Sequence, residues 1–128
     1  MVKKVGPMIH VPDVQKTVDW YKDIGFTVTD SFDDEGELNW AMLSLGTSEL
    51  MFNAGGRSSS SDRREVDLYV YVENIDDLYI QLKERAEVVG EIDNTFYGMR
   101  EFIIRDPNRF WVTFGQEAPS RQTNQPAG

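Results

Sequence analysis

The sequence contains no cysteine and only one histidine, His10, among its 128 residues. The lack of cysteine excludes disulfide bonds and thiolate chemistry, and it leaves the cellular compartment open. The sequence also lacks any run of about 18 apolar residues, so we expect no membrane span and no membrane partner. It has no glycine-rich phosphate loop, nucleophile elbow or metal-spaced histidine pair. Because none of these common motifs is present, motifs alone do not identify a reaction.

Basic residues are fewer than acidic ones, 13 against 22, which gives a net charge of −9 at pH 7. A nucleic-acid partner needs a basic surface, so this balance argues against one. The charge is compatible with a cationic ligand, and the alternative is simply a solvated acidic surface. The opening residues lead into Gly6-Pro7 and not into the apolar region of a signal peptide, so we expect a cytoplasmic protein.

The most informative pattern is an internal repeat at a spacing of about sixty residues. The first half of the repeat pairs Val11 with Val72, Asp13 with Asn74, Val14 with Ile75, Val18 with Tyr79 and Tyr21 with Leu82. After a slip of one residue it pairs Gly36 with Gly98, Trp40 with Phe102, Leu50 with Val112 and Phe52 with Phe114. Two copies of one strand-helix-strands unit predict a pseudo-symmetric α+β domain with a groove between the halves.

Helical and strand periodicities predict the elements of each copy. In the first copy we expect a strand at 5–11, a helix at 14–24 capped by Asp13 and ended by Gly25, and strands at 26–32, 38–45 and 49–53. In the second we expect a strand at 66–72, a helix capped by Asn74, and strands at 87–89, 99–105 and 110–115. A single domain should thus cover residues 1–116, as a first module at 1–53, a flexible linker at 54–64 and a second module at 65–116, with a loose polar tail at 117–128.

Alternation along four of the strands separates an almost purely apolar face, expected beneath the helices, from a mixed face. A mixed aromatic and polar face is typical of a small-molecule pocket, and the alternatives are a second core layer or a dimer interface. With Trp40, whose ring offers a further stacking surface, the candidate ligand-binding residues are Met8, His10, Met51, Asp67, Tyr69, Tyr71, Trp111 and Thr113.

Two stretches of the sequence carry a resemblance to a known family. They are Pro7-x-x-His10-Val11-x-Asp13-Val14 followed by Trp20-Tyr21-x-x-x-Gly25-Phe26, and the closing stretch from Tyr97-Gly98-Met99-Arg100-Glu101 to Arg105-Asp106-Pro107. Over residues 5–115 the sequence resembles the vicinal oxygen chelate superfamily of glyoxalases, extradiol dioxygenases and bleomycin-resistance proteins, and looks most like the bleomycin-resistance branch. The resemblance implies two βαβββ modules curled around a cavity, in a homodimer.

The resemblance also implies where a metal ion would bind, because enzymatic members carry His, Gln or Glu at four cavity positions. Those positions correspond here to Gly6, Met51, Asp67 and Thr113. Only Asp67 is a plausible ligand for a divalent ion, since such ions need three or four nitrogen or oxygen donors. We therefore expect no metal and no other cofactor.

The role of His10 stays open between general-base catalysis with Asp67 as its orienting partner, ligand contact and structural packing. Arg100, Glu101, Arg105 and Asp106 are expected to form turn and ion-pair structure around the Asp-Pro corner. The leading hypothesis is a metal-free protein, without a catalytic residue, that sequesters an aromatic or cationic ligand such as a bleomycin-like antibiotic. The alternatives are a divalent-metal-dependent lyase, isomerase or dioxygenase, and a structural dimer that fills its cavity with its own side chains.

Overall fold

The computed structural model describes residues 3–119, which divide between Ser60 and Ser61 into two compact units. We call these units the first and the second module, and each contains one helix and one four-stranded mixed sheet. The first module contains β1 (Met8–His10), α1 (Val14–Asp23), β2 (Thr27–Asp34), β3 (Glu37–Leu45) and β4 (Ser48–Asn53). The second contains β5 (Leu68–Tyr71), α2 (Ile75–Leu82), β6 (Glu87–Asn94), β7 (Met99–Arg105) and β8 (Trp111–Glu117).

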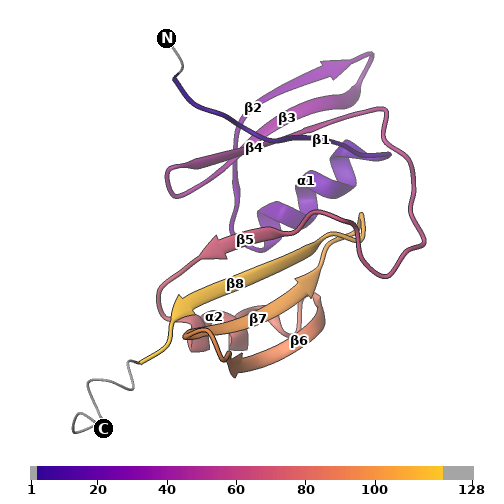
Figure 1. Cartoon of the computed structure of the whole chain (residues 1–128). Coiled ribbons are helices and arrows are strands. Elements are labelled where there is room, and N and C mark those ends of the chain that lie inside the picture. The colour runs from indigo at the N-terminus through magenta and orange to yellow at the C-terminus, as the bar shows by residue number, and fades with distance from the viewer. Residues whose placement is uncertain (1–2, 120–128) are drawn as a thin grey trace, which may run out of the picture. The chain divides into compact units, whose positions relative to one another are not determined.

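The two sheets have the same topology (Figure 1). Their strand orders are β1-β4-β3-β2 and β5-β8-β7-β6, and in each sheet the first-named pair is parallel and the others are antiparallel. The hydrogen bond that follows the end of each parallel pair is also the same in both modules. The amide of Val11 donates to the carbonyl of Asn53 at 2.8 Å, and that of Val72 donates to Gly115 at 2.9 Å. The α+β fold built from a repeated unit is confirmed.

Helix α1 begins and ends where its sequence predicts. The Asp13 side chain accepts a hydrogen bond from the amide of Lys16 at 3.0 Å, which satisfies one of the free amides of the first turn. After the helix, Gly25 takes a φ of +115°, a conformation that side chains disfavour. The apolar stripe of the helix packs on its own sheet, and the Tyr21 ring centroid lies 4.9 Å from that of Phe52.

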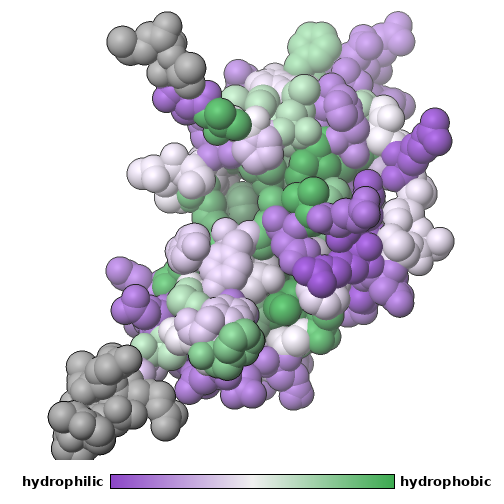
Figure 2. Space-filling model, viewed as in Figure 1, coloured by the Kyte–Doolittle hydropathy of each residue, from purple (hydrophilic) through white to green (hydrophobic). Residues whose placement is uncertain are grey.

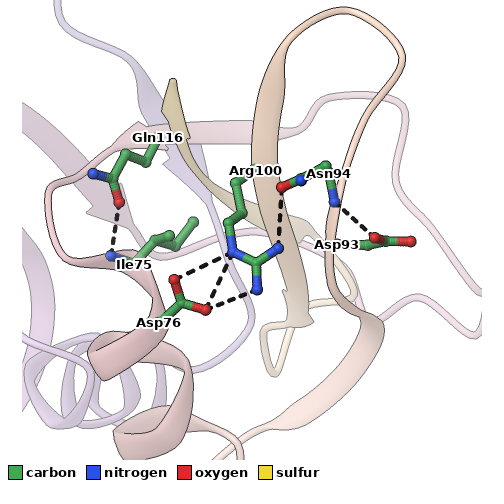
Figure 3. Close-up of polar contacts among 6 residues, drawn as sticks. All are labelled: Ile75, Asp76, Asp93, Asn94, Arg100 and Gln116. Atoms are coloured by element: carbon green, nitrogen blue, oxygen red, sulfur yellow. Dashed lines mark hydrogen bonds and ion pairs between the residues drawn. The ribbon is translucent and has the colours of Figure 1, made fainter. Parts of the chain in front are cut away.

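Helix α2 is capped differently from the prediction (Figure 3). Asn74 lies at the N-cap but adopts a left-handed conformation, with φ 56° and ψ 48°, and its side chain makes no capping bond. A capping side chain needs an extended backbone to reach the helical amides, so this conformation explains the wrong prediction. Gln116 of β8 caps the helix instead, because its Oε1 accepts a hydrogen bond from the amide of Ile75 at 2.9 Å.

The predicted equivalence of Trp40 and Phe102 is wrong by one residue. Phe102 pairs with Phe114 as Ala41 pairs with Phe52, so Ala41 is the true counterpart of Phe102. The cause is the turn that follows: Phe114 is twelve positions after Phe102 but Phe52 is only eleven after Ala41, because the β7–β8 turn is longer than the β3–β4 turn. Trp40 is therefore the counterpart of Glu101. A β-bulge also precedes Trp40, since Phe32 faces Trp40 while the next residue of β2 faces Leu38, which leaves Asn39 as an extra residue.

Several strand bounds also differ from the predicted ones. Strands β1 and β5 are shorter than expected, and Pro7, which immediately precedes β1, has no amide hydrogen to extend the ladder. Strand β6 is longer, because its hairpin with β7 continues to a bond from Thr95 N to Met99 O at 2.7 Å. The predicted tail begins inside β8, which runs to Glu117, and its residues 120–128 lie outside the described residues. Within residues 3–119 no helix is long and apolar enough to cross a membrane.

Candidate functional site

The face of the first module that lies opposite α1 carries two rows of side chains. Neighbouring strand partners point to the same side of a sheet, so the register defines each row. One row contains Met8, Met51, Met42 and Asp30, and the other contains His10, Asn53, Trp40 and Phe32. The predicted residues Met8, His10, Trp40 and Met51 thus share one face. The register also places Asn53 there and adds Met42, Phe32 and Asp30 to this face.

His10 is exposed, and its ring Nδ1 lies 3.3 Å from the carbonyl oxygen of Ala54. A carbonyl oxygen only accepts hydrogen bonds, so this contact favours the tautomer protonated at Nδ1 and leaves Nε2 as an acceptor. Asp67, the orienting partner considered for His10, forms an ion pair with Arg63. Within the first module, the backbone carbonyl of Ala54 can orient this ring.

The corresponding face of the second module is lined by tyrosine and glutamate. The register places Tyr71 beside Gly115 and Glu101, and Tyr69 beside Thr113. The Tyr69 and Tyr71 ring centroids lie 4.9 Å apart at an interplanar angle of 50°. Tyr71 is 80% exposed and Tyr69 is 38% exposed, so both rings present surface to solvent.

Exposed apolar groups are not confined to this pair of tyrosines. Hydrophobic surface alternates with hydrophilic surface on the side of the molecule seen in Figure 2. Such exposed apolar surface is often an interaction site, although single exposed apolar residues are common. The exposed large apolar or aromatic side chains of residues 3–119 are Val5, Met8, Phe32, Val66, Tyr69, Tyr71, Ile80, Phe96 and Tyr97.

Glu101 is the centre of a polar cluster that the sequence did not predict. Its Oε2 accepts a hydrogen bond from the Tyr69 hydroxyl at 2.7 Å, and its Oε1 accepts one from the Tyr97 hydroxyl at 2.7 Å. Burial and the hydrogen bond to Glu101 raise the pKa of the Tyr69 phenol. The same carboxylate, through its hydrogen bond, raises the pKa of Tyr97. We expected Glu101 to form ion pairs, and this was wrong, because its partners are phenols.

The signal for Glu101 was present in the alternation of β7. Phe102 and Ile104 are buried at 1% and 0% exposure, so Glu101 must point to the opposite side of the strand, the side that carries Tyr69.

Trp111 and Asp67 are already engaged by the segment that precedes β5. The Arg63 guanidinium lies 4.0 Å from the Trp111 ring centroid and forms an ion pair with Asp67. The hydrogen bond to Asp67 raises the pKa of Arg63. Both predicted ligand-binding side chains thus interact with a cation from their own chain.

Residues 61–64, predicted to be part of a flexible linker, are fixed to the second module by further contacts. The Arg109 Nε donates to the carbonyl of Ser61 at 2.6 Å, and the Arg105 Nε donates to that of Asp62 at 3.0 Å. The amide of Arg64 donates to Arg109 O at 3.1 Å. The arginines on the β7–β8 side of the module thus bind this segment through its backbone.

Arg100 serves the fold and not the tyrosine face. Its guanidinium donates to both carboxylate oxygens of Asp76 on α2 and, through Nη1, to Asn94 Oδ1 at 3.0 Å (Figure 3). The predicted ion-pair role of Arg100 is confirmed, but it lies at the start of α2 and not at the Asp-Pro corner. At that corner Asp106 Oδ1 accepts from the amides of Asn108 and Phe110, each at 2.8 Å, as a turn residue should.

The four positions at which the resemblance implies metal ligands do not fit a divalent ion. Gly6 offers no side chain, and a Cβ added to it would lie 3.8 Å from the Met51 methyl carbon. Thr113 is 6% exposed and Asp67 is paired with Arg63. A thioether, a neutral hydroxyl and one neutralised carboxylate do not provide the donors that such an ion needs. Residues 3–119 contain no cluster of three His, Cys, Asp or Glu side chains placed to hold a metal.

Solved structures share this architecture at low sequence identity. TioX from Micromonospora sp. ML1 superposes with a TM-score of 0.73 at 19% identity, covering 91% of this chain and 99% of TioX. A glyoxalase/bleomycin resistance protein/dioxygenase from Alicyclobacillus acidocaldarius gives a TM-score of 0.74 at 16% identity, over 93% and 94% of the two chains. A bleomycin-binding protein complexed with bleomycin gives 0.65 at 18% identity, over 91% and 99%.

No curated protein sequence matches the chain. The likenesses to solved structures, all below 25% identity, establish the fold alone. A family profile matches residues 5–114, which include both copies of the repeat. The chain belongs to the Glyoxalase/Bleomycin resistance protein/Dioxygenase superfamily.

Proposed function

We propose that this protein binds and sequesters a small aromatic or cationic molecule, such as a bleomycin-like antibiotic, without a metal ion and without chemical turnover. The observation that carries the proposal is the solvent-facing pair Tyr69 and Tyr71 on a sheet face that, in a merely solvated surface, would carry charged side chains. Flat rings with exposed faces bind planar molecules by stacking and cations by their π electrons. The net charge of −9 attracts cations at long range.

The first module has a face of its own that suits a ligand of this kind. Met8, Met42 and Met51 form a row of flexible thioethers that can adapt to an apolar ligand, and Trp40 adds a large ring two positions along β3 from Met42. A bleomycin complex of one protein with this fold supports a ligand of this class. On the face of the first module, His10 adds a polar group for ligand contact. We further propose that the protein acts in the cytoplasm as a homodimer.

Isothermal titration calorimetry with bleomycin and with other planar cationic antibiotics tests the proposal. We expect a Tyr71→Ala variant and a Trp40→Leu variant each to weaken binding about tenfold, the loss of one stacking or cation–π contact. Ile80→Ala is the matched control, because Ile80 is an apolar residue that is 62% exposed on α2 and should not affect affinity. Undetectable binding of every compound by the wild-type protein would refute sequestration of this ligand class.

Elemental analysis of protein grown with supplemented divalent metals distinguishes the enzymatic alternative. We expect less than about a tenth of an equivalent of any divalent metal per chain, since the four positions lack suitable donors. One tightly held equivalent, lost in an Asp67→Ala variant, would instead support a metal-dependent enzyme.

A further inference from the structure

We propose that Glu101, with the Tyr69 and Tyr97 phenols that donate to it and the Tyr71 ring that packs on Tyr69, is the subsite that takes the ammonium group of the ligand. This tyrosine–carboxylate site, defined by these four residues, deepens the proposed function and rests on it, because it assigns the charged part of the ligand to one carboxylate. The predicted ligand-binding set contains Tyr69 and Tyr71, whereas Glu101 and Tyr97 are new.

The first argument is the charge of Glu101, which the described chain does not compensate. Among the ion pairs of residues 3–119 none involves Glu101. The adjacent Arg100 is bound by Asp76 and Asn94, and successive residues of a strand point to opposite faces. Glu101 is half-buried, and a partly desolvated carboxylate gains most from a cation that approaches it.

The second argument is the direction of the hydrogen bonds. Both phenols donate to Glu101, at 2.7 Å each, so their O–H groups are used within the site. What the site offers a ligand is therefore the remaining lone pairs of the carboxylate, the phenol oxygens and the ring faces. All of these attract a cation and disfavour an anion. The raised pKa of the Tyr69 phenol extends the alkaline range over which it stays protonated and donates to Glu101.

The third argument is that the backbone makes room for the cluster. A Cβ added at Gly115 would lie 2.0 Å from the Tyr69 hydroxyl oxygen and 2.6 Å from its Cζ, so the Tyr69 side chain crosses the strand where Gly115 has no side chain. The positive φ that often explains a glycine does not occur at Gly115. Its role is space. Tyr69 reaches Glu101 only because this one position of β8 is glycine.

The experiment uses benzyltrimethylammonium as a permanent cation and benzyl alcohol as an uncharged comparator, titrated against the whole chain and followed by amide chemical shifts. We expect benzyltrimethylammonium to shift the amides of Tyr71 and Gly115. A Glu101→Gln variant should weaken its binding about tenfold and leave that of benzyl alcohol within about twofold. Glu91→Gln is the matched control, because Glu91 is an exposed glutamate of β6 and its loss changes the net charge equally.

Equal weakening by Glu101→Gln and Glu91→Gln would overturn the proposal, because the cation would then be held by overall charge alone. Unchanged binding in Glu101→Gln, or no binding by the wild type, would also overturn it. Gly115→Ala should reproduce the loss of cation binding by displacing Tyr69. If that variant does not fold, Tyr97→Phe, which removes one phenol donor, should change the affinity in its place.

The outcomes separate this site from the proposed function. Glu101-dependent binding of the small cation by a protein that binds no antibiotic supports the site and refutes the antibiotic ligand. Antibiotic binding that is unaffected by Glu101→Gln retains sequestration and refutes the site.

Discussion

Replacing Gln116 with methionine should destabilise the second module by uncapping α2. In the wild-type protein the side-chain Oε1 of Gln116 accepts a hydrogen bond from the amide of Ile75 at 2.9 Å. Methionine has a similar length and volume but is a poor hydrogen-bond acceptor. Ile75 is only 1% exposed, so water reaches this part of the helix poorly and cannot fully replace the lost acceptor.

The expected cost follows from these contacts. Loss of a helix N-cap, or of one partner of a partly buried hydrogen bond, reduces stability by about 1–2 kcal/mol. For a chain of 128 residues this corresponds to a fall in Tm of about 3–8 °C. Asn74→Gly is the matched control. Asn74 makes no capping bond and its left-handed backbone suits glycine, so we expect a change within about 0.5 kcal/mol.

Urea unfolding followed by far-UV circular dichroism measures both free energies of unfolding. The reasoning would be refuted if Gln116→Met unfolded at the wild-type urea midpoint while Asn74→Gly lost more than about 1 kcal/mol. That result would restore Asn74 as the cap of α2. A loss in both variants would show that the two residues share the role.

The remaining predictions concern charged and phenolic side chains. The hydrogen bond from Arg100 holds the pKa of the Asp76 carboxyl below its usual range. Asp76 therefore contributes stability above its unfolded pKa, and this stability is lost as the pH falls through the folded pKa. The urea midpoints of wild type and Asp76→Asn should differ at neutral pH and converge in acid. Tyr69 has a raised pKa, so its contribution to stability is present below the ordinary tyrosine pKa and is lost as the pH rises through the folded pKa. Tyr69→Phe should therefore remove one phenol that titrates above the ordinary tyrosine range from the ultraviolet absorbance titration. Arg63→Gln removes the cation from the Trp111 ring and should reduce hydrogen-exchange protection across residues 61–64, and unchanged protection would show that backbone contacts alone fix this segment.

The fold could be predicted from the sequence because the residues that repeat are those of the buried core. Val14 and Ile75, like Phe52 and Phe114, occupy equivalent buried places and keep their apolar character in both copies. The one-residue error at Trp40 could not be avoided in this way. The β7–β8 turn is longer than the β3–β4 turn, which shifts the equivalent strand positions by one residue without changing the pattern of apolar residues, so only the register reveals the shift.

The candidate site was harder to predict because its contacts depend on side-chain direction. Alternation correctly grouped Tyr69 with Tyr71, and the same rule applied to β7 would have added Glu101. No sequence rule shows that Arg63 lies over Trp111, since that contact depends on how a segment without regular structure folds back on its own module. The glycine and serine content of residues 54–64 indicated a flexible linker. In the structure Arg105 and Arg109, which lie far away in the sequence, bind the backbone of its last part.

The two modules use one backbone for different chemistry, and Gly115 explains why the difference is not freely exchangeable. Met8 and Tyr69 occupy equivalent places on the first strands of their modules, and Asn53 occupies the place of Gly115. A tyrosine at position 8 could not cross its sheet as Tyr69 does, because Asn53 carries a side chain where Gly115 leaves room. The first module also has Trp40 where the second has Glu101, so a tyrosine at position 8 would find no carboxylate there to accept its hydrogen bond. The duplicated backbone thus carries a methionine-rich face in the first module and a cation-attracting face in the second. The residue on the adjacent strand, Asn53 or Gly115, limits which side chain each face can accept.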